Sequence, residues 1–190
     1  MPLNIPNLLT WARIVMIPLF VGVFYSPWQW LAPAEQNLWA MLIFIAAAVT
    51  DGFDGYLARR LNQTSAFGAF LDPVADKLMV AAALIVLLQL GRADAVVAFI
   101  IIGREIAISA LREWMAKIGA SKSVAVSFLG KLKTASQMVA IPMLLYHDRL
   151  GPVDPQLIGS WLIGVAALLT LLSMGYYMYR AWPEIAARSR

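Results

Sequence analysis

The 190-residue sequence contains no cysteine and a single histidine, His147. It therefore has no disulfide framework, no cysteine zinc site, no thiol nucleophile and no histidine-rich metal site. Charge is also scarce, since Asp, Glu, Lys and Arg make up 14% of the chain, against about 25% in soluble domains. Hydrophobic residues reach 61%, above the roughly 45–50% of such domains. This composition excludes a disordered chain and predicts a membrane protein.

Long apolar runs account for most of the hydrophobic excess. A helix needs about 17–25 apolar residues to cross a bilayer, and the sequence contains six such runs. They cover approximately residues 8–25, 37–58, 71–90, 94–118, 124–146 and 157–179. The connections are too short to hold a soluble domain, and nothing at the N-terminus resembles a cleaved signal. We therefore expect a single domain over residues 1–190, an all-α integral membrane protein built as a bundle of six transmembrane helices.

Lysines and arginines are unequally distributed between the two ends of these spans. Only Arg92 and Arg149 fall in the first, third and fifth connections, and the other thirteen of the fifteen lie at the opposite ends. Because cytoplasmic loops are enriched in Lys and Arg, both termini and the basic ends are expected on the cytoplasmic side. A basic rim also attracts anionic lipids, but that role does not explain charges placed a turn or more inside the apolar runs.

Four aspartates lie inside the spans, Asp51 and Asp54 in the second and Asp72 and Asp76 in the third. An aspartate deep in a span costs about 2.5–3.5 kcal/mol, so these side chains should face one another, a cation or a water-filled cavity. Spacings of three and four residues place each pair on one helical face. A hard divalent cation, Mg²⁺ or Mn²⁺, would relieve the repulsion. The alternative is helix capping, with Asp72 as an N-cap before Pro73.

Glycines and an arginine lie between the two aspartate pairs. Gly55 and Gly68 allow a ligand or another backbone to approach closely, and the Arg59 guanidinium can bind phosphate through two hydrogen bonds. Together with carboxylates and a divalent metal, these residues suit a diphosphate. They indicate phosphoryl transfer, in which a protein mainly positions groups and neutralises developing charge.

Residues 51–76 also carry a family signature. They contain the pattern DGxxAR(x8)GxxxDxxxD, which begins at Asp54 and ends at Asp76. This pattern resembles the signature of the CDP-alcohol phosphatidyltransferases, and Asp51 supplies a further aspartate upstream. The resemblance implies transfer of a phosphatidyl group from a CDP-linked lipid to an alcohol with release of CMP. It also implies six membrane helices around a cytoplasm-facing polar cavity, a divalent metal and a homodimer.

The resemblance further implies a role for each residue of the signature. The implied metal ligands are Asp51, Asp54, Asp72 and Asp76. The implied site for the nucleotide diphosphate of CDP-diacylglycerol consists of Gly55, Arg59 and Gly68. Asp76 is also the implied general base.

Three segments outside the signature bear on the acceptor alcohol. Residues 4–13, 103–105 and 130–137 resemble the NIPNxLTxxR, GRE and GKxKTxxQ segments of bacterial family members that make phosphatidylglycerol phosphate. The implied acceptor is sn-glycerol 3-phosphate, and the implied location is the bacterial cytoplasmic membrane. The last span contains no motif of this kind.

Cationic residues in the fourth and fifth spans support a charged acceptor independently. Arg104, Arg112, Lys131 and Lys133 lie in the basic halves of these spans. A phosphate needs several cationic donors, whereas a neutral alcohol does not. We predict that these four side chains bind the phosphate of glycerol 3-phosphate. In the alternative interpretation, the arginines pair with neighbouring glutamates and the lysines extend to the interface.

The remaining polar and aromatic residues receive simpler interpretations. Thr10 and Arg13 are candidates for lining the donor site. Most tyrosines and tryptophans, including Tyr177 and Trp161, are assigned to interfacial belts. His147 lies on the opposite side and receives no catalytic role. No nucleic-acid partner is expected.

Two alternative functions compete with this one. Intramembrane carboxylates also occur in ion transporters, but a transporter predicts polar residues across the whole membrane and often a repeated half. Here the polar residues gather at one end of the spans. A sister transferase with another acceptor alcohol remains the alternative. Within the signature no Ser, Cys or His stands in a triad-like arrangement, which favours direct attack over a covalent intermediate.

Overall fold

The structure, a computed structural model, describes residues 5–25, 31–61, 66–120 and 128–188. These residues form six α-helices and no β-strand. The helices are α1 (Ile5–Tyr25), α2 (Pro33–Leu61), α3 (Ala66–Gln89), α4 (Ala95–Lys117), α5 (Phe128–Tyr146) and α6 (Pro155–Arg188). Each predicted apolar run overlaps one helix, so the prediction of an all-α chain with six helices is confirmed.

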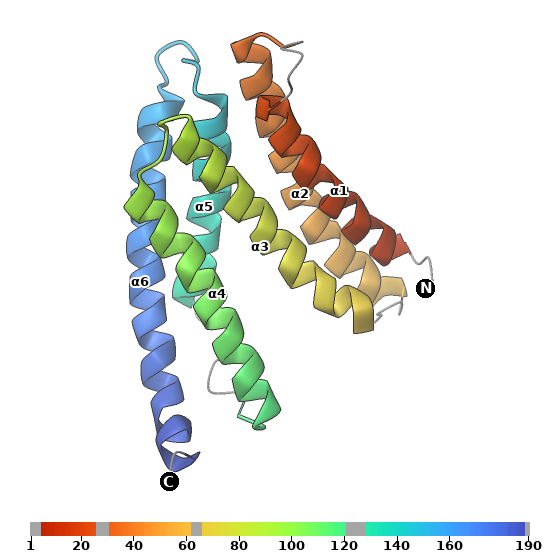
Figure 1. Ribbon diagram of the computed structural model, residues 1–190, viewed down its shortest axis with the longest axis vertical. Helices are drawn as coiled ribbons and strands as arrows, with labels where there is room; N and C mark the ends of the chain where they lie inside the picture. Colours follow the sequence, from red (N-terminus) through yellow and green to blue (C-terminus); the bar gives the residue numbers. More distant parts are fainter. Residues whose placement is uncertain (1–4, 26–30, 62–65, 121–127, 189–190) are drawn as a thin grey trace.

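The helices pack in two groups (Figure 1). In the first group α1 packs on α2 and α3, and in the second α4 and α5 pack on α6. Contacts between α2 and α5, and between α3 and α4, join the groups. The N-terminal end of α1 and the C-terminal end of α6 lie toward the same end as the C-terminal ends of α2 and α4. The charged segments of the sequence are therefore brought to that end of the bundle.

An apolar core holds the two groups together. It includes Phe20, Phe44, Leu84, Ile101 and Leu144, all of which are fully or almost fully buried. These side chains come from α1 through α5, at helical spacing within each element. A second, smaller cluster lies between α4 and α6 near the charged end and contains Ile108 and Met115. The site described below lies between these two apolar clusters.

The outer faces of the helices are also apolar. Leu19, Ile85, Phe99, Trp161 and Leu168 are each more than half exposed, and soluble monomers rarely expose such surfaces. Within the described ranges, two helices are long and apolar enough to cross a membrane on length and composition alone, over Leu8–Tyr25 and Pro155–Ala186. The other four contain the charged residues discussed above, which lower their hydropathy.

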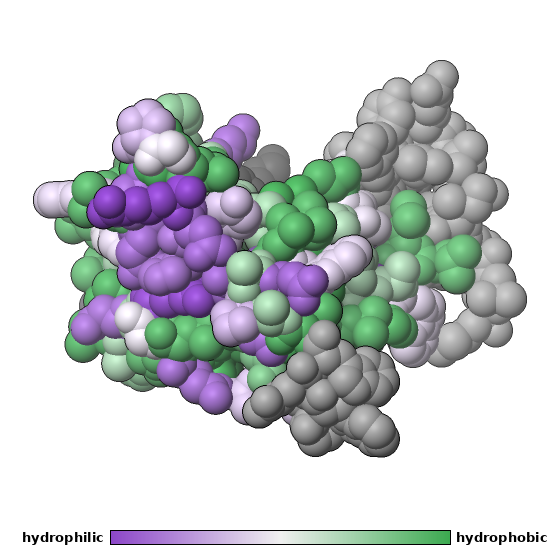
Figure 2. All heavy atoms as spheres, turned by 90° about the horizontal axis from the view of Figure 1, so that it is seen from above, coloured by the Kyte–Doolittle hydropathy of each residue, from purple (hydrophilic) through white to green (hydrophobic). Residues whose placement is uncertain are grey.

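The end of the bundle opposite the two chain termini has its own polar surface. Figure 2 shows hydrophilic side chains gathered on one part of this end, beside hydrophobic ones. Arg92 donates a hydrogen bond from Nη1 to the carbonyl oxygen of Leu145 at 2.9 Å. It thereby satisfies a carbonyl of the last turn of α5, which has no partner within the helix. Partial burial lowers the pKa of Arg92 below its ordinary value.

The capping interpretation of Asp72 is wrong. Helix α3 begins at Ala66, so Asp72 and Pro73 lie inside it rather than at its start. A proline within a helix removes one backbone hydrogen bond and crowds the preceding turn. Burial of Gly68 and Ala75 on either side of Pro73 nevertheless keeps this stretch packed against its neighbours. Asp72 therefore does not cap α3, and its carboxylate can take part in the candidate site.

Candidate active site

Helix α1 contributes two buried polar side chains to the site. Thr10 and Arg13 are 2% and 1% exposed and lie on one face, three residues apart. Thr10 Oγ1 donates a hydrogen bond to Asp72 Oδ1 at 2.6 Å. Arg13 Nη1 forms an ion pair with Asp51 Oδ1 at 2.8 Å. One apolar helix therefore holds an aspartate of α2 and another of α3.

Asp76 lies between two cavities. With Asp51, Gly52 and Thr134 it lines a cavity of about 410 Å³ between α2, α3 and α5, here called the aspartate cavity. It also lines a cavity of about 240 Å³ between α3, α4, α5 and α6, here called the cationic cavity. The other side chains of the cationic cavity include Lys77, Arg104, Glu105, Arg112, Lys133 and Tyr177.

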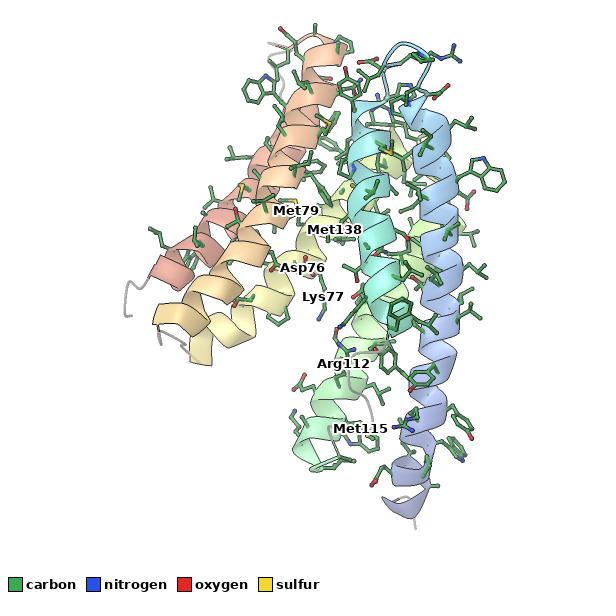
Figure 3. All side chains as sticks on the ribbon, turned by 180° about the vertical axis from the view of Figure 1, so that it is seen from behind. Asp76, Lys77, Met79, Arg112, Met115 and Met138 are labelled. Carbon is green, nitrogen blue, oxygen red and sulfur yellow. The ribbon has the colours of Figure 1, made fainter. Side chains whose placement is uncertain are left out.

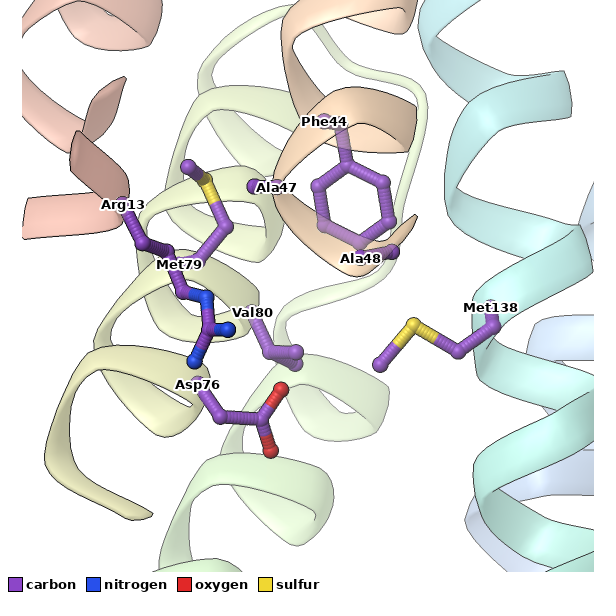
Figure 4. Close-up of a pocket in the computed structure, with 8 residues that line it drawn as sticks. All are labelled: Arg13, Phe44, Ala47, Ala48, Asp76, Met79, Val80 and Met138. Atoms are coloured by element: carbon purple, nitrogen blue, oxygen red, sulfur yellow. The ribbon is translucent and has the colours of Figure 1, made fainter. Parts of the chain in front are cut away.

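Two views show how Asp76 is placed. In Figure 3 Asp76 and Lys77 extend from α3 toward the space beside α4 and α5, where Arg112 is also labelled. In Figure 4 the Asp76 carboxylate lies near the Arg13 guanidinium, and Met138 of α5 faces them across the pocket. The Asp76 charge interacts with Asp51 and Arg13 and also with residues of the cationic cavity. Asp76 thus belongs to both cavities electrostatically as well as geometrically.

Glu105 holds two cations of the cationic cavity. Its Oε1 accepts from Lys133 Nζ and lies 3.3 Å from Arg104 Nη1. Arg104 Nη2 also donates to Ser173 Oγ at 3.1 Å. Arg104 and Lys133 are 6% and 3% exposed, and buried charges of this kind need such partners. Arg104 therefore forms the glutamate pair that the alternative interpretation predicts.

Arg112 is held differently. Its Nη2 donates to Tyr177 Oη at 3.0 Å, whereas the adjacent Glu113 pairs with Lys117 on the helix surface. The guanidinium carbons of Arg104 and Arg112 lie 5.5 and 5.1 Å from the centre of the Tyr177 ring, within cation–π range. The assignment of Tyr177 to an interfacial belt is wrong, because its side chain is fully buried.

The sequence contains a signal for the buried position of Tyr177, which is a stripe of polar residues on α6. Thr170, Ser173 and Tyr177 are all fully buried, and their spacing of three and four residues places them on one helical face. Such a stripe in an otherwise apolar helix indicates that the face meets polar partners. The absence of a recognised motif in the last span concealed this signal.

Three buried donors near the cationic cavity have no hydrogen-bond partner among the described residues. They are Arg104 Nε, Arg112 Nε and Gln137 Nε2. Gln137 lines a small pocket together with Asp76, Glu105 and Lys133. Buried donors of this kind normally find a partner in the protein, in water or in a ligand. Gln137 is the last residue of the GKxKTxxQ segment.

The other predicted site residues are distributed as follows. Gly68 is buried in α3, and the side chains of Asp54, Gly55 and Arg59 lie outside the described part of the structure. Lys131 is exposed and does not line the cationic cavity. Residues two apart on a helix do not share a face, which separates Lys131 from Lys133.

The described aspartates do not by themselves complete a metal centre. In the part of the chain that the structure describes, no three Asp, Glu or His side chains converge on one point. Asp51 and Asp76 nevertheless line the same cavity. Asp72 is oriented by Thr10, and carboxylate oxygens are the donors that Mg²⁺ and Mn²⁺ prefer. The chemistry of this donor set fits a hard divalent cation.

Comparison with known proteins agrees with the signature. A family model described as CDP-alcohol phosphatidyltransferase matches residues 3–172. The chain belongs to the CDP-alcohol phosphatidyltransferase family. Family members are phosphotransferases that generally depend on a divalent metal. The aspartate cavity lies within the matched region of this phosphatidyltransferase, as do residues 155–172 of α6.

Several relatives match this phosphatidyltransferase over nearly its full length. One from Sodalis glossinidius (strain morsitans) is 53% identical over 184 residues, covering 95% of this chain and 96% of the relative. One from Escherichia coli (strain K12) is 51% identical over 187 residues, covering 97% and 98%. One from Shigella flexneri has the same identity and coverage. All three are named CDP-diacylglycerol–glycerol-3-phosphate 3-phosphatidyltransferase.

Proposed function

We propose that this enzyme transfers the phosphatidyl group of CDP-diacylglycerol to sn-glycerol 3-phosphate, giving phosphatidylglycerol phosphate and CMP. The names of its relatives support these substrates. The observation that carries the proposal is the position of Asp76, which lines both the aspartate cavity and the cationic cavity. A donor in the first cavity and an acceptor in the second would meet at this carboxylate.

The aspartate cavity is the proposed donor site. Asp51, Asp54, Asp72 and Asp76 would hold Mg²⁺ or Mn²⁺, which neutralises charge on the diphosphate when bound. Gly55, Arg59 and Gly68 would bind the nucleotide diphosphate itself. The hydrogen bond from Thr10 to Asp72 and the ion pair from Arg13 to Asp51 support this arrangement, because partners behind metal ligands fix their orientation.

The cationic cavity is the proposed acceptor site. Its lining includes four cations and two carboxylates, so a net of two positive charges faces a ligand. Arg104, Arg112 and Lys133 would bind the acceptor phosphate, and the two unpartnered Nε donors of the arginines support this role. Lys131 was predicted as a fourth donor, but its exposed position favours a role at the rim.

The proposed reaction is a direct displacement. Asp76 accepts the proton of the 1-hydroxyl of glycerol 3-phosphate, and this oxygen bonds to the β-phosphorus of CDP-diacylglycerol. The bond from that phosphorus to the bridging oxygen breaks, and the electron pair leaves with CMP. Arg59 stabilises the departing phosphate. Each substrate is held by its own set of side chains, so the positioning needed for a single displacement is supplied without a covalent enzyme intermediate.

We also propose that all six helices span the bacterial cytoplasmic membrane, with both termini and both cavities on the cytoplasmic side. The exposed apolar side chains along the bundle and the excess of Lys and Arg at the charged end support this topology. The assembly is proposed to be a homodimer, which follows from the family resemblance.

One assay tests the proposed function. Purified protein in detergent is incubated with CDP-diacylglycerol, Mg²⁺ and one acceptor at a time, and CMP release is measured. The acceptors are glycerol 3-phosphate, serine, inositol and phosphatidylglycerol. CMP release with glycerol 3-phosphate alone is the expected result. Faster release with any other acceptor would favour a sister transferase and contradict the proposal.

A further inference from the structure

Helix α6 reaches the acceptor site through Tyr177. This side chain is fully buried and lines the cationic cavity. Its hydroxyl accepts a hydrogen bond from Arg112 at 3.0 Å, and its ring lies within cation–π range of Arg104 and Arg112. No motif of the sequence analysis includes Tyr177. A single aromatic residue therefore contacts both arginines of the proposed acceptor site.

Two guanidinium groups would not otherwise gather at one place. Arg104 and Arg112 are eight residues apart on α4, which corresponds to about 12 Å along the helix axis. Their like charges repel, most strongly where water is excluded. The face of an aromatic ring attracts cations, and the tyrosine oxygen accepts from one of them. Tyr177 thus opposes the repulsion and draws the two guanidiniums together.

The hydrogen bonds of the arginines leave specific donors open. Arg104 uses Nη1 toward Glu105 and Nη2 toward Ser173, while Arg112 uses Nη2 toward Tyr177. The Nε atoms of both arginines are buried and have no hydrogen-bond partner among the described residues. The protein therefore holds three of the four terminal nitrogens of these guanidiniums and leaves both Nε donors without a partner among the described residues.

We propose that Tyr177 is a positioning residue for the acceptor, which aligns Arg104 and Arg112 so that both bind the phosphate of glycerol 3-phosphate. This inference rests on the proposed acceptor site. The competing interpretation is that Tyr177 only fills the apolar cluster between α4 and α6, where it packs with Ile108 and Met115. The two interpretations predict different kinetics.

The test is Tyr177→Phe, which keeps the ring and its packing but removes the hydroxyl. The KM for glycerol 3-phosphate should rise about 2- to 10-fold, as expected for one hydrogen bond. The KM for CDP-diacylglycerol, kcat and the melting temperature in detergent should stay at the values of the unmodified protein. Tyr179→Phe is the matched control, because Tyr179 lies on the same helix and is 78% exposed.

A double-mutant cycle with Arg112→Gln shows whether Tyr177 affects the acceptor KM through Arg112. If Tyr177 acts through Arg112, the acceptor KM of the double variant should equal that of Arg112→Gln alone. Fully additive effects would overturn the inference. So would an unchanged acceptor KM in Tyr177→Phe, or a rise in both KM values together with a lower melting temperature, since these indicate a packing role.

Two outcomes of these measurements separate the inference from the proposed acceptor site. If Arg112→Gln raises the acceptor KM but Tyr177→Phe does not, the inference fails and the acceptor site stands. If neither variant changes it, the acceptor site itself is wrong. Should Tyr177→Phe not fold, Ser173→Ala removes the neighbouring α6 contact to Arg104, and an unchanged acceptor KM in that variant would overturn the inference.

Discussion

The first and last helices make an instructive comparison. Both α1 and α6 are apolar enough to cross a membrane, and each carries a pair of buried polar side chains on one face. In α1 these are Thr10 and Arg13, which contact carboxylates. In α6 they are Ser173 and Tyr177, which contact guanidiniums. The two terminal helices therefore hold opposite charges on opposite sides of Asp76.

The difference between the helices lies in how they stabilise those charges. Helix α1 uses a buried cation, and a buried cation requires a paired anion to offset its desolvation. Helix α6 uses only neutral groups, a hydroxyl and a phenol ring, which stabilise arginines without cancelling their charge. The cationic cavity therefore keeps a positive charge that an anionic substrate can neutralise. We conclude that α6 supports the side of the site meant for a free anion with neutral side chains, while Glu105 of α4 offsets only part of its positive charge.

The strongest test of this division removes the residue that both sides share. Asp76→Asn should lower kcat by about 100-fold or more, as loss of a general base does. Affinities for CDP-diacylglycerol and Mg²⁺ are measured alongside, because Asp76 is also a proposed metal ligand. Asp148→Asn, an exposed position at the other end of the bundle, serves as the control. Near-normal turnover of Asp76→Asn at saturating metal would rule out this base.

The second test asks whether the two cavities bind different substrates. Arg112→Gln removes a charge-assisted bond and should raise the KM for glycerol 3-phosphate about 10- to 150-fold, with little change in the KM for CDP-diacylglycerol. Arg59→Gln should do the reverse. Lys117→Gln, on the exposed surface of α4, is the control for Arg112. Each substrate is titrated at saturating levels of the other, and equal effects on both KM values would contradict the division.

The exposed Lys131 sharpens the same comparison. Lys133→Gln should raise the acceptor KM by at least about 10-fold, because its ammonium is buried in the cationic cavity. Lys131→Gln should have a smaller effect, because it can act only through longer-range, screened attraction. At high salt, the effect of Lys133→Gln on the acceptor KM should change little, whereas the effect of Lys131→Gln should disappear. Equal effects of the two substitutions would contradict the placement of these side chains.

The fourth test addresses the support that α1 gives to Asp72. Thr10→Val keeps the shape of the side chain but removes the donor to Asp72. Loss of such a partner behind a metal ligand should raise the Mg²⁺ concentration for half-maximal activity about 10-fold. Thr50→Val is the matched control, because the Thr50 hydroxyl donates to the backbone carbonyl of Ala46 in its own helix. An unchanged metal requirement would show that Thr10 does not orient Asp72 for metal.

The smallest effect is expected from packing between α5 and α6, away from both cavities. A Cβ at Gly159 would lie 2.8 Å from Leu144 Cγ and 3.2 Å from the Ala140 carbonyl oxygen. Gly159→Ala should therefore destabilise the fold by about 1–3 kcal/mol, measured as a lower melting temperature, while both KM values stay the same. Gly164→Ala, with open space around its Cβ, should not lower the melting temperature.

Much of this molecule could be predicted from the sequence. Composition and the lengths of the apolar runs give six helices, because both signals are local. The spacing of Asp51, Asp54, Asp72 and Asp76 gives the family signature, because the chemistry needs those residues at those intervals. Helical spacing also predicts that Lys131 and Lys133 face different directions, since they are two residues apart.

The tertiary structure decided which residues each helical face contacts. Thr10 and Asp72 are 62 residues apart, and Arg112 and Tyr177 are 65 apart. Helical periodicity fixes which residues share a face, but it does not fix which helix that face meets. The sequence by itself therefore determined the helices, their charged residues and the family. Only the packing of α3 against α2, α4 and α5 placed Asp76 between two cavities, and only the packing of α4 against α6 placed Tyr177 beside two arginines. Such contacts depend on long-range burial rather than on local spacing.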